Sequence, residues 1–195
     1  ALDVRAKLDQ AVAGWRANTE HWLRMQALEV LDSLTPEDVP VALEVLATVK
    51  SDYGLHLALG KRIAILWGAT EPVPALKWLV GELPREHRGD PMQAILTDWS
   101  QRTPQQALAW WQGVTDSLDF PIPEDAFERF ESVIYSGWAA QDPASLVASL
   151  PALDSLEAFQ HSEGIPGSEK FMGLATAAVN PTTRESTLAA IASIQ

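Results

Sequence analysis

Residues 95–111, ILTDWSQRTPQQALAWW, contain a pattern that occurs three times in this chain of 195 residues. IAILWGATEPVPALKWL at 63–79 and IYSGWAAQDPASLVASL at 134–150 align with it without gaps. In each segment an Ile lies four residues before a Trp, and the Trp lies five residues before a Pro. Three copies of Ile-x3-Trp-x4-Pro indicate an internal repeat.

Each copy predicts two short helices joined by a tight turn. An Ile and a Trp four residues apart share one face of a first helix, and a Pro is favoured at the first position of a second helix. Thr103 and Asp142 precede their Pro as suitable N-caps, whereas Glu71 does not. Thr103 with Gln106 also forms a capping-box pattern. Beyond the Pro, apolar residues form a helical stripe in every copy: Ala75, Leu76 and Leu79; Ala107, Leu108 and Trp111; Leu146, Val147 and Leu150.

Weaker copies flank the three clear ones. In the N-terminal copy, Val30 takes the Ile position, Leu34 takes the Trp position, and ALEVL (42–46) matches the second helix. In the C-terminal copy, Met172 takes the Ile position, Thr176 takes the Trp position, and Asn180-Pro181 matches the start of the second helix. Degenerate end copies are expected in a stacked array, because one face of each meets solvent instead of a neighbour.

Helical patterns continue outside the copies. Residues 2–33 predict one or two helices with a break at Asn18-Thr19. Further helix starts are predicted near residues 51–52, 90–91, 123 and 168, and no segment shows the alternation of a strand. The expected fold is therefore all-α, with stacked helix-turn-helix repeats that form an α-solenoid, or α-α superhelix, of about ten helices and no sheet.

We expect residues 1–195 to form a single helical-repeat domain. Within it, residues 1–50 hold the N-terminal helices and the degenerate first copy, 51–150 hold the clear copies, and 151–195 hold a degenerate last copy. The chain ends at Gln195 on an apolar helical run without a cap, so we expect it to continue beyond this residue.

Composition argues against several classes of function. The formal charge of −12 repels phosphate backbones, so we expect no nucleic-acid partner. Apolar runs fall far short of the about 20 residues that cross a bilayer, so we expect no membrane insertion. The chain has no Cys, which removes disulfides and thiolate chemistry. The compartment stays open between the cytoplasm and export after removal of a signal peptide.

Six of the eight Trp residues lie in the three clear copies, and they fall into two groups. Trp111 and the Trp of each copy occupy apolar positions, so we expect them to pack in the core. Trp78 and Trp110 lie to the side of their helical stripe. They are candidates for an apolar strip that binds a partner, with plain packing as the alternative.

Two loops add candidate partner-binding residues. REHRGDP at 85–91 gathers Arg85, His87 and Arg88 before a helix start, where they would bind a carboxylate or phosphate; the alternative is a solvated loop. GVTDSLDFPIPED at 113–125 carries Phe120, and it is either a binding loop or a Pro-fixed spacer.

The chain carries no motif for a catalytic, cofactor or metal site. Its four His are widely separated, and GIPGSEK at 164–170 departs from the phosphate-loop pattern. We therefore assign no catalytic residue, cofactor or metal ligand.

The paired short helices, the period of 32 to 39 residues and the aromatic-then-Ala-Leu pattern resemble the tetratricopeptide-like class of α-solenoids over most of residues 30–195. The Leu-Gly and Tyr of the tetratricopeptide signature are missing, and the fixed Pro is foreign to it. The resemblance implies a non-enzymatic scaffold that binds a protein or peptide, or packs against other parts of a larger chain. The alternatives are an enzyme with an acidic pocket for a sugar or cationic substrate, and a self-associating structural array; the oligomeric state is left open.

Overall fold

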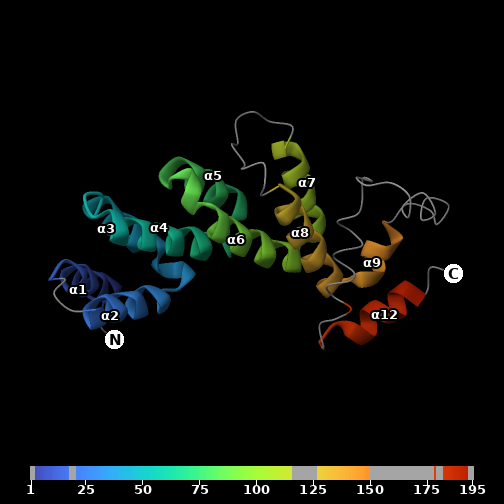
Figure 1. Cartoon of the computed structure of the whole chain (residues 1–195), viewed down its shortest axis with the longest axis horizontal. Helices are drawn as coiled ribbons and strands as arrows, with labels where there is room; N and C mark the ends of the chain where they lie inside the picture. Colours follow the sequence, from blue (N-terminus) through green and yellow to red (C-terminus); the bar gives the residue numbers. More distant parts are fainter. Residues whose placement is uncertain (1–2, 18–20, 116–126, 150–177, 179–181, 193–195) are drawn as a thin grey trace. The chain divides into compact units, whose positions relative to one another are not determined.

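The structure, a computed structural model, describes residues 3–17, 21–115, 127–149, 178 and 182–192. This part of the chain contains ten α-helices, two short 3-10 helices and no strand, which confirms the predicted all-α fold of stacked helices (Figure 1). The chain divides into two compact units, residues 1–95 and 96–195, and the division falls inside one helix. These are the N-terminal unit and the C-terminal unit.

Short connections join helices that are neighbours in sequence. The N-terminal unit holds α1 (Val4–Ala17), α2 (His21–Asp32), η1 (Pro36–Asp38), α3 (Val39–Thr48), α4 (Tyr53–Gly68), α5 (Pro72–Glu82), η2 (Arg85–His87) and the start of α6 (Gly89–Arg102). The C-terminal unit holds the rest of α6, α7 (Pro104–Thr115), α8 (Phe127–Gln141), α9 (Pro143–Ala148) and α12 (Arg184–Ala192). Residues 2–33 thus form two helices, while their predicted break and the predicted helix starts near 123 and 168 lie outside the described residues.

Several helices pack against their sequence neighbour, and some also pack against the next helix but one. In the N-terminal unit α1 packs against α2 and α3, and α4 packs against α2, α3 and α5. In the C-terminal unit α8 packs against α7 and α9, and α9 packs against α12. Contacts of both kinds are typical of stacked helix pairs.

The three turns of the repeat are built by the same backbone hydrogen bonds. Each Pro is the first residue of its helix, as predicted: Pro72, Pro104 and Pro143. The carbonyl of each Trp accepts the N–H four residues later, and all three bonds measure 2.8 Å: Glu71 to Trp67, Thr103 to Trp99, and Asp142 to Trp138. The residue before the Pro then accepts from the second helix at 3.1 to 3.2 Å: Ala75 to Glu71, Ala107 to Thr103, and Leu146 to Asp142. One residue therefore closes the first helix and opens the second.

The side chain of the residue before the Pro makes a different hydrogen bond in different copies. Asp142 accepts a hydrogen bond from the Ser145 N–H at 3.0 Å, so it caps its helix as predicted. Glu71 makes no cap bond, also as predicted; its longer side chain reaches back to accept the indole N–H of Trp67 at 2.8 Å. The capping box of Thr103 and Gln106 stays a prediction.

A small buried residue directly follows each Trp and lets helices approach closely. These residues are Gly68, Ser100 and Ala139. In the N-terminal unit the side chain of Ile95 lies over Gly68, where an added Cβ would be 2.6 Å from its Cγ1. In the C-terminal unit Ser100 lies over Gly137, where an added Cβ would overlap its hydroxyl. Small side chains therefore bring α4 to α6, and α6 to α8.

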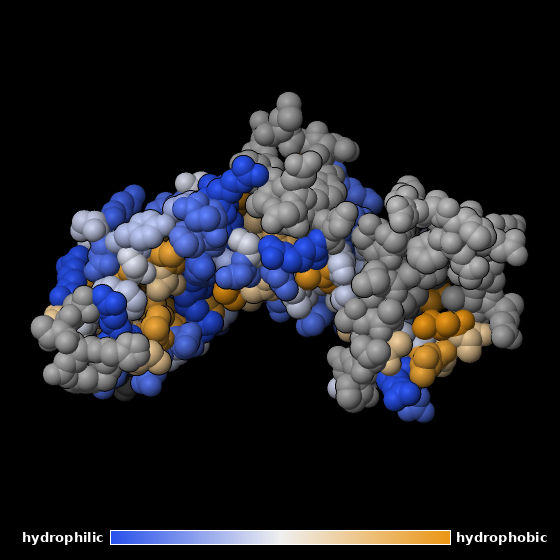
Figure 2. Space-filling model, in the orientation of Figure 1, coloured by the Kyte–Doolittle hydropathy of each residue, from blue (hydrophilic) through white to orange (hydrophobic). Residues whose placement is uncertain are grey.

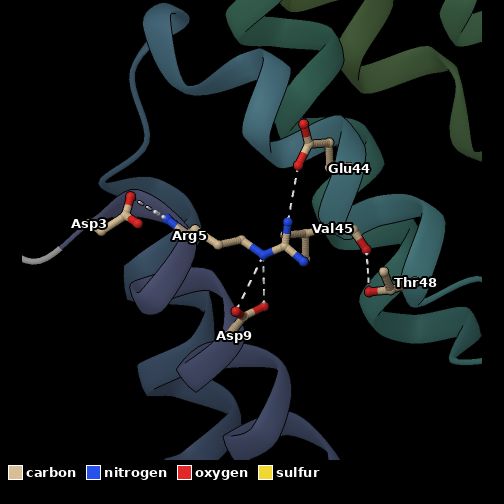
Figure 3. Close-up of polar contacts among 6 residues, drawn as sticks. All are labelled: Asp3, Arg5, Asp9, Glu44, Val45 and Thr48. Carbon is tan, nitrogen blue, oxygen red and sulfur yellow. Dashed lines mark hydrogen bonds and ion pairs between the residues drawn. The ribbon is translucent and has the colours of Figure 1, made fainter.

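Arginines in the N-terminal unit hold helix ends together. Arg62 of α4 donates to the carbonyls at the end of α2 at 2.8 to 3.0 Å: Leu31, Asp32 and Leu34. Arg16 donates to the last carbonyl of α3, that of Thr48, at 3.3 Å. Figure 3 shows Arg5 of α1 between Asp9 of the same helix and Glu44 of α3. Cations at helix C-termini satisfy carbonyls that have no partner within the helix.

Replacement of Gly68 by Ala should destabilise the fold by about 1 to 3 kcal/mol, because the new methyl group overpacks the contact with Ile95. The control is Gly81→Ala in α5, where an added Cβ meets nothing within 4 Å. This control should stabilise the protein by about 0.5 to 1 kcal/mol, since Ala favours helix more than Gly does. Urea unfolding of the two variants measures the difference, and equal effects would contradict the close helix contact.

Candidate interaction surface

The Trp residues of the repeat pack inside the protein, as predicted. Trp99, Trp111 and Trp138 are buried. The ring of Trp111 meets that of Phe130 edge-on, with centroids 5.6 Å apart. Trp67 is half-buried and keeps its indole N–H bonded to Glu71. These rings are therefore packed in the core.

The two flanking Trp residues are half-buried, and each covers the Trp of its own copy. The ring of Trp78 lies 6.2 Å from that of Trp67, and the ring of Trp110 lies 5.7 Å from that of Trp99. Trp78 belongs to the N-terminal unit and Trp110 to the C-terminal unit. A common strip of the two rings stays a prediction.

The basic loop and the end of α5 before it contact α4. Residues on successive turns of α4 contact residues 82–90 in four places. One contact is an ion pair, one is between two aromatic rings, one places a Leu side chain against a glycine, and one joins a His to a carboxylate. These contacts are Lys61 with Asp90 at 3.6 Å, Tyr53 with His87 at 6.1 Å between centroids, Gly60 with Leu83, and His56 with Glu82 at 2.9 Å.

The predicted basic cluster is split between a structural role and a surface role. Arg88 folds back, and its Nε donates to the carbonyl of Leu83 at 2.7 Å, directly after the end of α5. Burial chiefly, and then the charge of Arg85, hold the pKa of the Arg88 guanidinium below its ordinary value, while Glu86 acts in the opposite direction. Arg85 is exposed and has no hydrogen bond or ion pair to any described residue.

Tyr53 is the residue that sequence reasoning missed. Its side chain is 58% exposed, more than any other large hydrophobic side chain in the described part of the chain. It begins α4 on the side away from the buried stripe of Leu55, Leu59 and Ile63. This offset from the apolar stripe can be read from the sequence, and it is the signal that could have predicted an exposed Tyr53. Tyr53, Arg85 and His87 together are called the Tyr53 surface below.

Charge is distributed unequally between the two units. The N-terminal unit has ten Lys and Arg against thirteen Asp and Glu, a net charge of −3. The C-terminal unit has four against thirteen, a net charge of −9. The Tyr53 surface therefore lies in the less acidic unit. Phe120, the remaining candidate residue, lies outside the described residues.

No group of three or more His, Asp or Glu among the described residues is placed to hold a metal ion. Among these residues no helix is long and apolar enough to cross a membrane. No protein-family model, curated protein or solved structure matches the chain.

Replacement of Arg88 by Met should lower the free energy of unfolding by about 1 to 2 kcal/mol, because the carbonyl of Leu83 loses a charged donor. Arg85→Met, three residues away and exposed, is the matched control and should change stability by less than about 0.5 kcal/mol. Thermal and urea unfolding check both values. Equal losses would mean that Arg88 has no special role in docking the loop.

Proposed function

We propose that this chain is a non-enzymatic helical-repeat scaffold that binds a protein or peptide partner, or other parts of a larger chain. The observation that carries the proposal is the repetition of one turn. Three helix pairs are joined by the same backbone hydrogen bonds, and the Trp residues of their first helices pack inside the protein. Stacked helix pairs of this kind present extended surfaces to partners, as the resemblance to tetratricopeptide-like proteins also implies.

The Tyr53 surface is the best supported contact region in the described part of the chain. Tyr and Arg are enriched at protein interfaces because they combine apolar area with hydrogen-bonding groups. Tyr53 offers a largely exposed ring, and Arg85 is a guanidinium that no described residue pairs. Two contacts with α4 hold the loop that carries Arg85 and His87, and two more hold the end of α5 just before it. A partner would therefore meet a surface that is already ordered, which lowers the entropic cost of binding.

The half-buried edges of Trp78 and Trp110 are secondary candidates. Each ring already covers another Trp, so its removal would disturb packing as well as binding. Variants of Tyr53 and Arg85 separate these effects better, because neither side chain is buried.

Affinity capture from lysate tests the proposal, with the wild-type chain compared with a Tyr53→Ala/Arg85→Ala variant. We expect a specific protein or peptide on the wild-type chain and at least about tenfold less on the variant, since interface Tyr and Arg residues often contribute more than 1 kcal/mol each. Met25→Ala is the matched control, because Met25 is an exposed apolar residue outside this surface.

Circular dichroism and the unfolding midpoint verify that each variant is folded. A partner retained equally by all three proteins would remove the Tyr53 surface from the proposal. The absence of any specific partner under conditions where the wild-type chain is folded would contradict the scaffold function itself.

A further inference from the structure

The 3-10 turn η2 presents two arginines from the same edge. The N–H of Arg88 donates to the carbonyl of Arg85 at 3.3 Å, so the two residues are one turn apart. Side chains three residues apart in a 3-10 helix eclipse each other. The Arg88 side chain is also directed back toward the start of the turn, because its Nε donates to the carbonyl of Leu83 at 2.7 Å. The two cations are therefore neighbours on one edge of η2.

A different edge of η2 faces α4. The ring of His87 lies 6.1 Å from that of Tyr53 in α4, and Asp90, three residues after His87, pairs with Lys61 of α4 at 3.6 Å. Successive residues of a 3-10 helix are turned by about 120°, so the edge of the two arginines points away from this contact. Contacts on one edge thus hold η2 in place and leave the other edge open to a partner.

Both guanidiniums keep donors without an acceptor in the described part of the chain. Arg88 uses its Nε on Leu83, and neither its terminal nitrogens nor any side-chain nitrogen of Arg85 has a hydrogen bond or ion pair with a described residue. Burial chiefly, and then the charge of Arg85, lower the pKa of Arg88, while Glu86 acts in the opposite direction. The two cations therefore repel each other, and an anion bound between them would relieve this repulsion.

We propose that Arg85 and Arg88 bind one carboxylate of a protein or peptide partner, with an apolar side chain of the same segment against the exposed ring of Tyr53. Planar guanidiniums match the two oxygens of a carboxylate. The bond to Leu83 fixes one guanidinium before the partner arrives, which lowers the entropic cost of binding. This inference rests on the proposed function, because it names the chemical group that the partner brings to the Tyr53 surface.

The surrounding charges favour a single carboxylate over a phosphate or a strongly acidic segment. Hydrophilic residues predominate on the face of the N-terminal unit that Figure 2 shows, and this unit has a net charge of −3. Glu86, between the two arginines in sequence, is exposed. A doubly charged phosphate meets more of this repulsion than a singly charged carboxylate does, and it has no apolar group to place on Tyr53. We therefore expect one Asp or Glu beside an apolar residue in the partner.

NMR signals of the arginine Nε–H groups in the whole chain test the proposal at about pH 6, where a Glu carboxylate is ionised. The probe is the peptide acetyl-Leu-Glu-Leu amide, and acetyl-Leu-Gln-Leu amide is its neutral match. The Glu peptide should shift the Arg85 and Arg88 signals in a saturable manner. The Gln peptide and inorganic phosphate should shift them less at equal concentration. The absence of a saturable shift with the Glu peptide would overturn the proposal, as would an equal shift with either of the other two probes.

A pair of charge-matched variants separates the site from the net charge of the chain. Arg85→Met should weaken binding of the Glu peptide by about threefold, the effect expected for one exposed charge contact. Arg184→Met is the control, because Arg184 is also exposed and without a described partner, and its loss changes the net charge equally. Circular dichroism verifies that both variants are folded. Equal weakening by the two substitutions would overturn the site.

The inference and the proposed function can fail separately. A specific partner captured from lysate, together with no binding of the Glu peptide, would overturn the carboxylate site and leave the scaffold function standing. Binding of the Glu peptide at Arg85 and Arg88 without any captured partner would support the site and contradict the scaffold function.

Discussion

The hydrogen bond from the residue before each Pro to the Trp carbonyl is the interaction on which the repeat depends. A Pro disfavours the α-helical conformation of the residue before it, and both Glu71 and Asp142 are non-helical, with φ and ψ of −133° and 76° and of −146° and 78°. The bond at 2.8 Å closes the last turn of the first helix, and the same residue accepts the first bond of the second. Because the turn leaves no spare residues, the second helix starts at once and packs back on the first.

Side-chain size then adapts this common turn to its place in the chain. Asp142 is short enough to cap its own helix, whereas the longer Glu71 reaches the indole of Trp67. The small residue after each Trp sets how closely neighbouring helices approach, through glycine at Gly68 and through the pairing of Ser100 with Gly137. A short backbone motif and a few small side chains thus account for much of the packing in each unit.

The fold was predictable because its signals are local. The spacing of Ile, Trp and Pro predicted the helix starts, and the character of Glu71 and Asp142 predicted which residue would cap. The small residue after each Trp was also present in the sequence, but its meaning depends on which helix lies opposite. The residues next to it in the sequence do not determine which helix lies opposite.

The candidate site was less predictable because its contacts are long-range. Arg85, His87 and Arg88 are adjacent in sequence, yet only the fold separates Arg88, which caps α5, from Arg85, which is exposed. Tyr53 is more than thirty residues from His87 in sequence, so no local pattern joins them. Arg62 likewise caps a helix that ends thirty residues earlier.

Residue-resolved amide hydrogen exchange by NMR tests the shared turn most directly. The N–H groups of Glu71, Thr103 and Asp142 lie at the ends of helices, where fraying would normally leave amides open to solvent. Exchange should be slow at all three, because each N–H donates to a Trp carbonyl at 2.8 Å and is followed by a Pro that fixes the turn. Exchange at the rate of an unstructured peptide at these positions, in an otherwise protected protein, would contradict the shared turn.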